Sequence, residues 1–99
     1  MIHFYRSAAI AQGKLANAMG FAKEISSYLK EKHGLDVEVS MPIGGNPNRI
    51  AWTAAYPNLA AYEAASLKLM ADSNYMEMAR KGAENFVSGS LKDQLWRAF

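Results

Sequence analysis

The sequence of 99 residues has no cysteine and only two histidines, His3 and His33. Without a thiol there is no disulfide to staple the fold, no thiolate nucleophile and no thiolate metal ligand. The two histidines are not spaced as metal ligands, so we predict no metal site. Walker, GxGxxG and GxSxG motifs are also missing, and we therefore predict no cofactor.

Long apolar runs and a dominant charge are missing as well. No run approaches the roughly 20 residues that span a bilayer, and the N-terminus lacks the apolar core of a signal peptide. Together with the lack of cysteine, this predicts a cytoplasmic protein with no membrane partner. Eleven Lys and Arg are interspersed with nine Asp and Glu, giving a net charge of +2. This balance does not form the basic stripe of a nucleic-acid-binding protein, so no nucleic-acid partner is predicted.

Hydrophobic residues make up 51% of the chain, enough to build one core, and we predict a single domain over residues 1–99. Alternation of apolar and polar residues predicts strands at 2–10, 35–41, 49–56 and 91–99. Helical periodicity predicts helices over 14–33 and from 59 to about 85, the second interrupted at the capping sequence DSN (72–74). The element order is therefore βαββαβ.

Right-handed crossovers favour one arrangement of these elements. It is an α+β ferredoxin-like fold, with a four-stranded antiparallel sheet in the order 4-1-3-2 and both helices on one face. The first, third and last strands carry large or apolar side chains at both parities, for example Phe4 beside Tyr5, Trp52 beside Ala51 and Leu95 beside Trp96. A monomer would expose many of these side chains. We therefore predict a homodimer that packs sheet on sheet, with the C-terminal segment LKDQLWRAF (91–99) reaching the partner.

Two stretches resemble NIPSNAP-like proteins of the dimeric α+β barrel superfamily. MIHFYRSAAIAQGK (1–14) has an Arg on the first strand and a Gly-Lys pair that opens the first helix. AAYPNLAAYEAASLKLMADSNY (54–75) resembles the group's second stretch, from the Tyr that ends the third strand to the Asp followed by an aromatic residue. The chain departs from the group's pattern at several positions, among them Gln12, where proline is usual.

The resemblance implies the dimeric α+β barrel fold. The superfamily includes cofactor-free quinone-forming monooxygenases, haem-degrading enzymes and stress-response proteins without known activity. The haem-degrading members have the same fold and a proximal His on the second helix. Residues 59–85 contain no His, so the resemblance does not favour haem degradation.

Five residues are candidates for a ligand site in the barrel. Arg6 in mid-strand is costly unless it meets an anion, so it is either a clamp for a ligand or part of an ion pair with Asp36, Glu38 or Asp93. The other candidates are aromatic or titratable side chains on predicted strands, and each has packing as its alternative role: His3, Trp52, Tyr56 and Trp96. We expect the mouth of the cavity, enclosed between two sheets, near Arg6, Trp52 and Tyr56. His33, at a helix end, is expected to be a surface cap.

Three functions remain open. The first is binding of a small aromatic or anionic molecule in the barrel, with cofactor-free oxygenation in which Arg6 stabilises a substrate anion and a Tyr or His3 relays its proton. The second is a structural or stress-related dimer without chemistry. The third is RNA binding, because RNA-recognition domains share the βαββαβ order. Strand 49–56, however, lacks their glycine-containing aromatic pattern.

Overall fold

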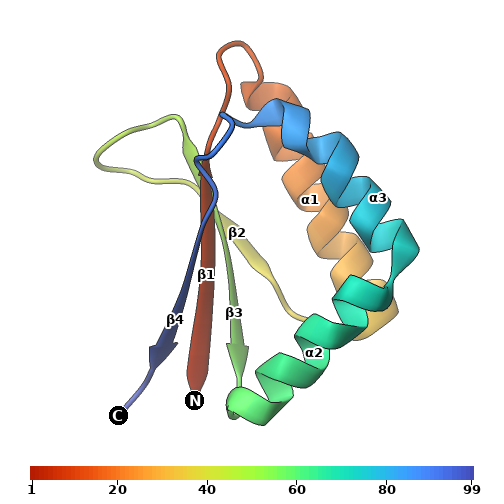
Figure 1. The fold of residues 1–99 in the computed structure, drawn as a ribbon. Coiled ribbons are helices and arrows are strands. Elements are labelled where there is room, and N and C mark those ends of the chain that lie inside the picture. Colours follow the sequence, from red (N-terminus) through yellow and green to blue (C-terminus); the bar gives the residue numbers. More distant parts are fainter.

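The computed structural model describes residues 1–99 and has the predicted ferredoxin-like α+β fold. The four strands form one antiparallel sheet in the order β2-β3-β1-β4, which is the predicted 4-1-3-2 order read from the other edge. The helices all lie on one side of this sheet, and the two termini lie close together (Figure 1). No helix is long and apolar enough to cross a lipid bilayer. The elements are β1 (Ile2–Ala9), α1 (Leu15–His33), β2 (Glu38–Ser40), β3 (Arg49–Tyr56), α2 (Leu59–Ala71), α3 (Ser73–Gly82), the 3₁₀ turn η1 (Ala83–Asn85) and β4 (Lys92–Arg97).

Local capping determines where the helices end. Gly34 ends α1 in the left-handed conformation, with φ of 66°, which a residue without Cβ adopts at little cost. Asn58 opens α2 by accepting a hydrogen bond from the backbone N–H of Ala61 at 2.8 Å. The predicted interruption of the second helix is confirmed, because Asp72 ends α2 and caps α3.

Strand β2 is shorter than the predicted 35–41. Its pairing with β3 begins only at Glu38, opposite Thr53. Ahead of it, the carbonyl of Val37 accepts a hydrogen bond from the Ser26 hydroxyl of α1 at 2.7 Å, and the Val37 side chain packs against the core. The alternating pattern of 35–37 therefore serves helix packing instead of strand pairing.

The strand register divides the sheet into a helix face and an open face. Arg6 pairs with Trp52 on one side and Asp93 on the other, so these three side chains share the helix face. The open face carries His3, Tyr5, Ser7, Ala9, Glu38, Ser40, Arg49, Ala51, Thr53, Ala55, Lys92, Gln94 and Trp96. The expectation of large or apolar side chains at both parities holds in part: the large side chains of β3 point to the helices, and the open face carries alanines, polar groups and the rings of Tyr5 and Trp96.

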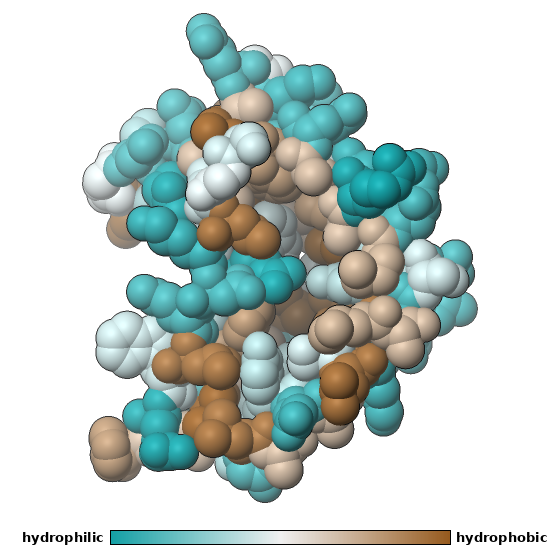
Figure 2. Space-filling view, viewed as in Figure 1, coloured by the Kyte–Doolittle hydropathy of each residue, from teal (hydrophilic) through white to brown (hydrophobic).

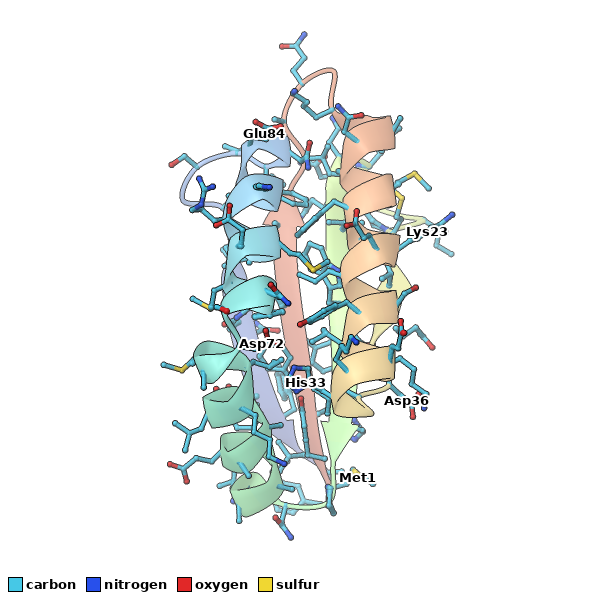
Figure 3. The ribbon with its side chains drawn as sticks, turned by 90° about the vertical axis from the view of Figure 1, so that its right-hand side faces the viewer. Met1, Lys23, His33, Asp36, Asp72 and Glu84 are labelled. Carbon is cyan, nitrogen blue, oxygen red and sulfur yellow. The ribbon has the colours of Figure 1, made fainter.

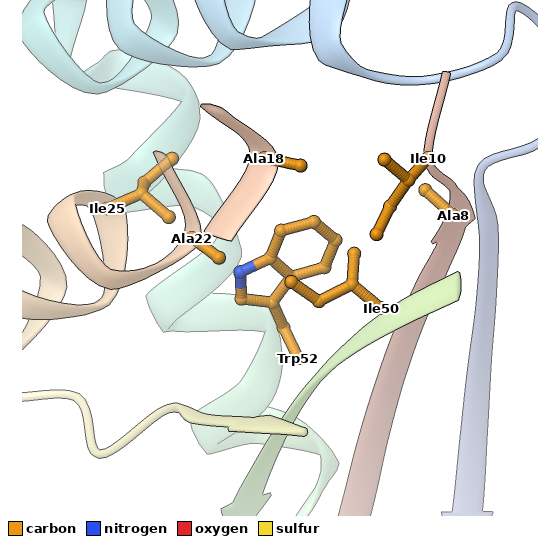
Figure 4. Packing of buried hydrophobic residues seen from close by; sticks show 7 residues of the cluster. All are labelled: Ala8, Ile10, Ala18, Ala22, Ile25, Ile50 and Trp52. Atoms are coloured by element: carbon orange, nitrogen blue, oxygen red, sulfur yellow. The ribbon is translucent and has the colours of Figure 1, made fainter. Parts of the chain in front are cut away.

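The core lies at one end of the helix face (Figure 4). Ala18 and Ala22 are completely buried, and their small side chains let α1 approach the sheet at Trp52. The indole Nε1 of Trp52 is buried and has no hydrogen-bond partner. The cluster consists of Ala8, Ile10, Ala18, Ala22, Ile25, Ile50 and Trp52.

A polar cluster around Asp72 ties α1 to the junction of α2 and α3 (Figure 3). Asp72 Oδ1 accepts hydrogen bonds from the backbone N–H groups of Asn74 and Tyr75, and Oδ2 accepts one from the Tyr28 hydroxyl at 2.7 Å. His33 Nε2 lies 2.8 Å from the same Oδ2, and its side chain is only 15% exposed. His33 is thus a partner of Asp72, and the expected role as a surface cap is wrong, since folding brings α3 against the end of α1.

The Asp72 cluster predicts a defined loss of stability in acid. Its hydrogen bonds, first that from His33 and then that from Tyr28, lower the pKa of Asp72 from 3.8 to about 2. A carboxyl with a depressed folded pKa stabilises the protein above pH 3.8, and this contribution is lost as the pH falls towards 2. Asp72→Asn should therefore unfold in urea with a weaker pH dependence between pH 4 and 2 than the wild type. Asp36→Asn, at an exposed carboxylate, is the control. Equal pH dependence in the wild type and Asp72→Asn would contradict the assignment.

Candidate functional site

A cavity of about 600 Å³ lies between the helix face of the sheet and the three helices. Eighteen of the 24 residues that line it are hydrophobic, a lining typical of pockets that take apolar ligands. Figure 2 shows the hollow between the sheet and the helices, with hydrophobic residues inside it. Strand β4 is the edge strand beside β1. Its principal contacts are with β1, and all of its residues are exposed.

Aromatic rings form one wall of the cavity. The ring of Tyr62 on α2 stacks on Phe4 of β1, with centroids 5.7 Å apart, and meets Tyr56 of β3 edge to face at 5.4 Å. Trp52 and Tyr75 also line the cavity. Rings held against each other present fixed flat surfaces on which a planar ligand can stack at little entropic cost.

The tyrosine hydroxyls give this wall a polar element. Burial, followed by the neighbouring Tyr62 and Tyr75, raises the pKa of Tyr56, so its phenol stays protonated at neutral pH. The hydroxyls of Tyr56 and Tyr62 make no hydrogen bond within the chain. They can therefore donate to an oxygen atom of a bound molecule.

Arg6 lies in the cavity with its charge already paired. Its Nε and Nη2 donate to the two carboxylate oxygens of Asp93 on β4 at 2.7 and 2.8 Å. The guanidinium carbon also lies 5.5 Å from the centroid of the Phe4 ring. The hydrogen bond to Asp93 is the main cause of the raised pKa of Arg6. Of the partners considered for Arg6 from the sequence, Asp93 is the one that the structure supplies, within the same chain.

The structure brings together three of the five predicted site residues. Arg6, Trp52 and Tyr56 line the cavity. His3 and Trp96 are paired with each other on the open face, on the other side of the sheet. The expectation that all five line one cavity is wrong, because residues of odd number on β1 point away from those of even number. This cavity lies between the sheet and the helices of one chain, whereas the expected cavity lay between the sheets of two chains.

Several residues of the cavity are absent from the predicted set. Tyr62 on α2 and Tyr75 on α3 line the cavity, and the Tyr62 ring stacks on Phe4 of the sheet. Helical periodicity could have found these two residues, since both rings lie on the sides of α2 and α3 that face the sheet. What the sequence did not reveal is that the space between them and the sheet remains open. The structure contains no group of three or more His, Cys, Asp or Glu side chains that could hold a metal ion.

The open face differs from an RNA-binding sheet. RNA-recognition domains stack bases on aromatic side chains of neighbouring strands. Here the open face of β3 carries Arg49, Ala51, Thr53 and Ala55, and none of these has an aromatic ring. Tyr5 and Trp96 are the only rings of β1 and β4 on this face besides His3. The arrangement gives no support to RNA binding.

The sheet order and the helices on one face define a ferredoxin-like α+β fold, with an aromatic cavity between the sheet and the helices. No protein-family model and no curated protein matches the chain. Solved structures match it over its whole length, and they include NIPSNAP proteins. An uncharacterized NIPSNAP domain protein from Burkholderia xenovorans has a TM-score of 0.84 and 13% identity, covering 100% of this chain and 95% of that one. A NIPSNAP family protein from Agrobacterium tumefaciens has a TM-score of 0.77 and 15% identity, covering 99% and 85%.

An antibiotic biosynthesis monooxygenase is also similar, with a TM-score of 0.74 and 11% identity over 100% of this chain and 99% of that one. At these identities the likeness is one of fold. The NIPSNAP-like resemblance seen in the sequence is confirmed at that level, and function has to be argued from the site.

Proposed function

We propose that the protein binds a small, flat aromatic molecule in the cavity between the sheet and the helices. The observation that carries this proposal is the partly open space of about 600 Å³ with aromatic walls and tyrosine hydroxyls that have no partner in the chain. A protein that needed only a packed core would fill such a space, because empty apolar volume costs stability. Its size matches that of sites for drug-sized ligands.

Cofactor-free oxygenation is the finer hypothesis, and the antibiotic biosynthesis monooxygenase of similar fold gives it some support. The residues first considered for it are less suitable in this arrangement. His3 lies on the open face, away from the cavity, and Arg6 already has Asp93 as its counter-ion. An arginine whose charge is neutralised by a carboxylate stabilises a substrate anion less than an unpaired one would. Binding is therefore the better supported function.

We also propose that the protein is a homodimer, with the open face of each chain against that of the other and β4 near the boundary. Tyr5 is 40% exposed and Trp96 57% exposed on this face, where Tyr5 pairs with Thr53 and Gln94 and Trp96 pairs with His3. Exposed aromatic rings on one face of a sheet suit packing against a second sheet, and such rings are enriched in interfaces. If no ligand binds, the structural or stress-related dimer remains as the alternative function.

Ligand binding predicts that filling the cavity abolishes it. Ala54 lies in the cavity wall on β3, between Trp52 and Tyr56, so Ala54→Phe places a ring in the space of the ligand. Calorimetric titration with 2-naphthol should give binding to the wild type and at least tenfold weaker binding to Ala54→Phe. Ala64→Phe, at an exposed position of α2, should bind like the wild type. Equal affinity of wild type and Ala54→Phe would show that the ligand binds elsewhere, and no binding of any naphthol or anthrol would refute the proposal.

A further inference from the structure

The charges around the cavity are unusual for a site that contains an arginine. Only two of the residues that line it are charged, Arg6 and Glu84. Asp93 adds a second carboxylate, since both of its oxygens accept hydrogen bonds from the Arg6 guanidinium. Glu84 is exposed to solvent, so the charge of the interior is that of the Arg6–Asp93 pair, which is neutral and offers a ligand no net positive charge.

We propose that the cavity selects uncharged aromatic molecules and rejects anionic ones, and that Asp93 determines this selectivity by occupying the anion position of Arg6. The inference rests on the proposed binding function and names the class of ligand. Arg6 was first considered as the binding group for a ligand anion. In the structure, Asp93 of the same chain already fills that role as the counter-ion of Arg6.

Asp93 is difficult for a ligand to displace. It stands directly opposite Arg6 in the β1–β4 register, so the backbone holds its carboxylate within reach of the guanidinium at all times. A tethered group has an effective concentration of millimolar or more, which a free ligand must exceed. The guanidinium offers Asp93 two parallel hydrogen bonds, the arrangement that planar carboxylates favour most. A ligand carboxylate would gain no more than these same two bonds, and it would first have to displace Asp93 into water, which its side chain reaches because it is 45% exposed.

Hydrogen-bond donors remain for an uncharged ligand. The guanidinium has five N–H groups, and Nη1 is not engaged by Asp93. The hydroxyls of Tyr56 and Tyr62 are also without partners in the chain. These donors suit a neutral oxygen atom, either the carbonyl of a ketone or the hydroxyl of a phenol. The predicted ligand is therefore a flat aromatic alcohol or ketone that is uncharged at neutral pH.

Two probes with the same rings test this selectivity. At pH 7, 2-naphthol is neutral and 2-naphthoate is an anion. Calorimetry on the wild type should show at least tenfold tighter binding of the naphthol. In Asp93→Asn the guanidinium loses its counter-ion, and the affinity for naphthoate should rise at least tenfold while that for naphthol changes less than threefold. The double variant Arg6→Met/Asp93→Asn should lose the gain for naphthoate.

Glu77→Gln is the matched control. Glu77 also accepts two hydrogen bonds from one arginine, Arg80, at 3.0 and 2.6 Å, but on the outer surface of α3. Its removal should leave the affinities for both probes unchanged. A wild type that binds naphthoate as tightly as naphthol, or tighter, would overturn the inference on selectivity while supporting ligand binding itself. The comparison on the wild type needs no variant and decides the question even if Asp93→Asn fails to fold. A wild type that binds neither probe would instead refute the proposed function.

Discussion

Replacing Trp96 with arginine is expected to convert the proposed dimer into a monomer at low micromolar concentration. Trp96 lies on the open face of the edge strand β4, and its side chain is 57% exposed in the single chain. In a two-fold interface each residue occurs twice, so one substitution removes two tryptophan side chains and the loss of association free energy is doubled. At about 2 kcal/mol for each copy, the change is about 4 kcal/mol, or roughly a thousandfold in the dissociation constant.

Sedimentation equilibrium measures this result directly. The wild type should have twice the chain mass of 10.9 kDa, and Trp96→Arg should have the mass of one chain. Leu67→Arg is the control, because Leu67 is 59% exposed on α2, on the other side of the sheet, and receives the same new charge. A wild type that sediments as a stable monomer would refute the dimer. Dissociation by both variants alike would mean that the interface is not on the open face.

The exposed C-terminal residues are a second reason to propose a dimer. Every residue of β4 is exposed in the single chain, and Phe99 at the end of the chain is fully exposed. An uncovered edge strand with apolar side chains invites association, and natural proteins usually cover such strands. A second copy would cover β4 and the end of the chain together. We therefore expect the tail LKDQLWRAF to form part of the dimer interface.

The sequence predicted the fold well because each element carries its own signal. The alternation along 49–56, the 3.6-residue period along 15–33 and the caps at Asn58 and Asp72 all depend on neighbours in sequence, and all are present in the structure. The handedness of the crossovers then left one sheet order. The least accurate element was β2, because its length depends on pairing with β3 and on the bond from Ser26, which no local pattern reveals.

The candidate site was predicted only in part, and for a physical reason. Strand parity showed that Phe4 and Arg6 share a face and that His3 lies on the other, but not which face the helices cover. The partner of Asp72 was missed for a related reason, since His33 is 39 residues away in the sequence. An open cavity is harder still to predict, because it depends on the distance between α2 and the sheet, whereas the composition of its walls is that of an ordinary core.

Gly82→Ala is expected to destabilise the protein, against the usual effect of this substitution in a helix. Gly82 ends α3 with φ of −69° and ψ of −20°, a conformation that alanine adopts freely. In an exposed helix, alanine is about 1 kcal/mol more favourable than glycine. Gly82 is buried, however, and a Cβ added there would overlap the ring of Phe21 on α1.

The Phe21 ring has little freedom to move aside. It packs edge to face on Trp52, with centroids 6.4 Å apart, and on Phe86 at 5.9 Å. Displacing it would disturb the core and the cavity together, since all three rings line the cavity. Overpacking of this kind typically costs about 1–3 kcal/mol. For a chain of this size, each kcal/mol lowers the melting temperature by roughly 4–8 °C.

Two further variants separate the overlap with Phe21 from any effect of the backbone. Gly20→Ala changes a helical glycine on α1 that has open space around it, and it should be more stable than the wild type by up to about 1 kcal/mol. Phe21→Ala removes the obstructing ring, at its own cost in stability. In that background Gly82→Ala should be neutral or stabilising when the free energy of unfolding is measured in urea, because contacting residues are not additive. If Gly82→Ala costs the same with and without the ring, Phe21 is not the reason that α3 has a glycine where it packs on α1.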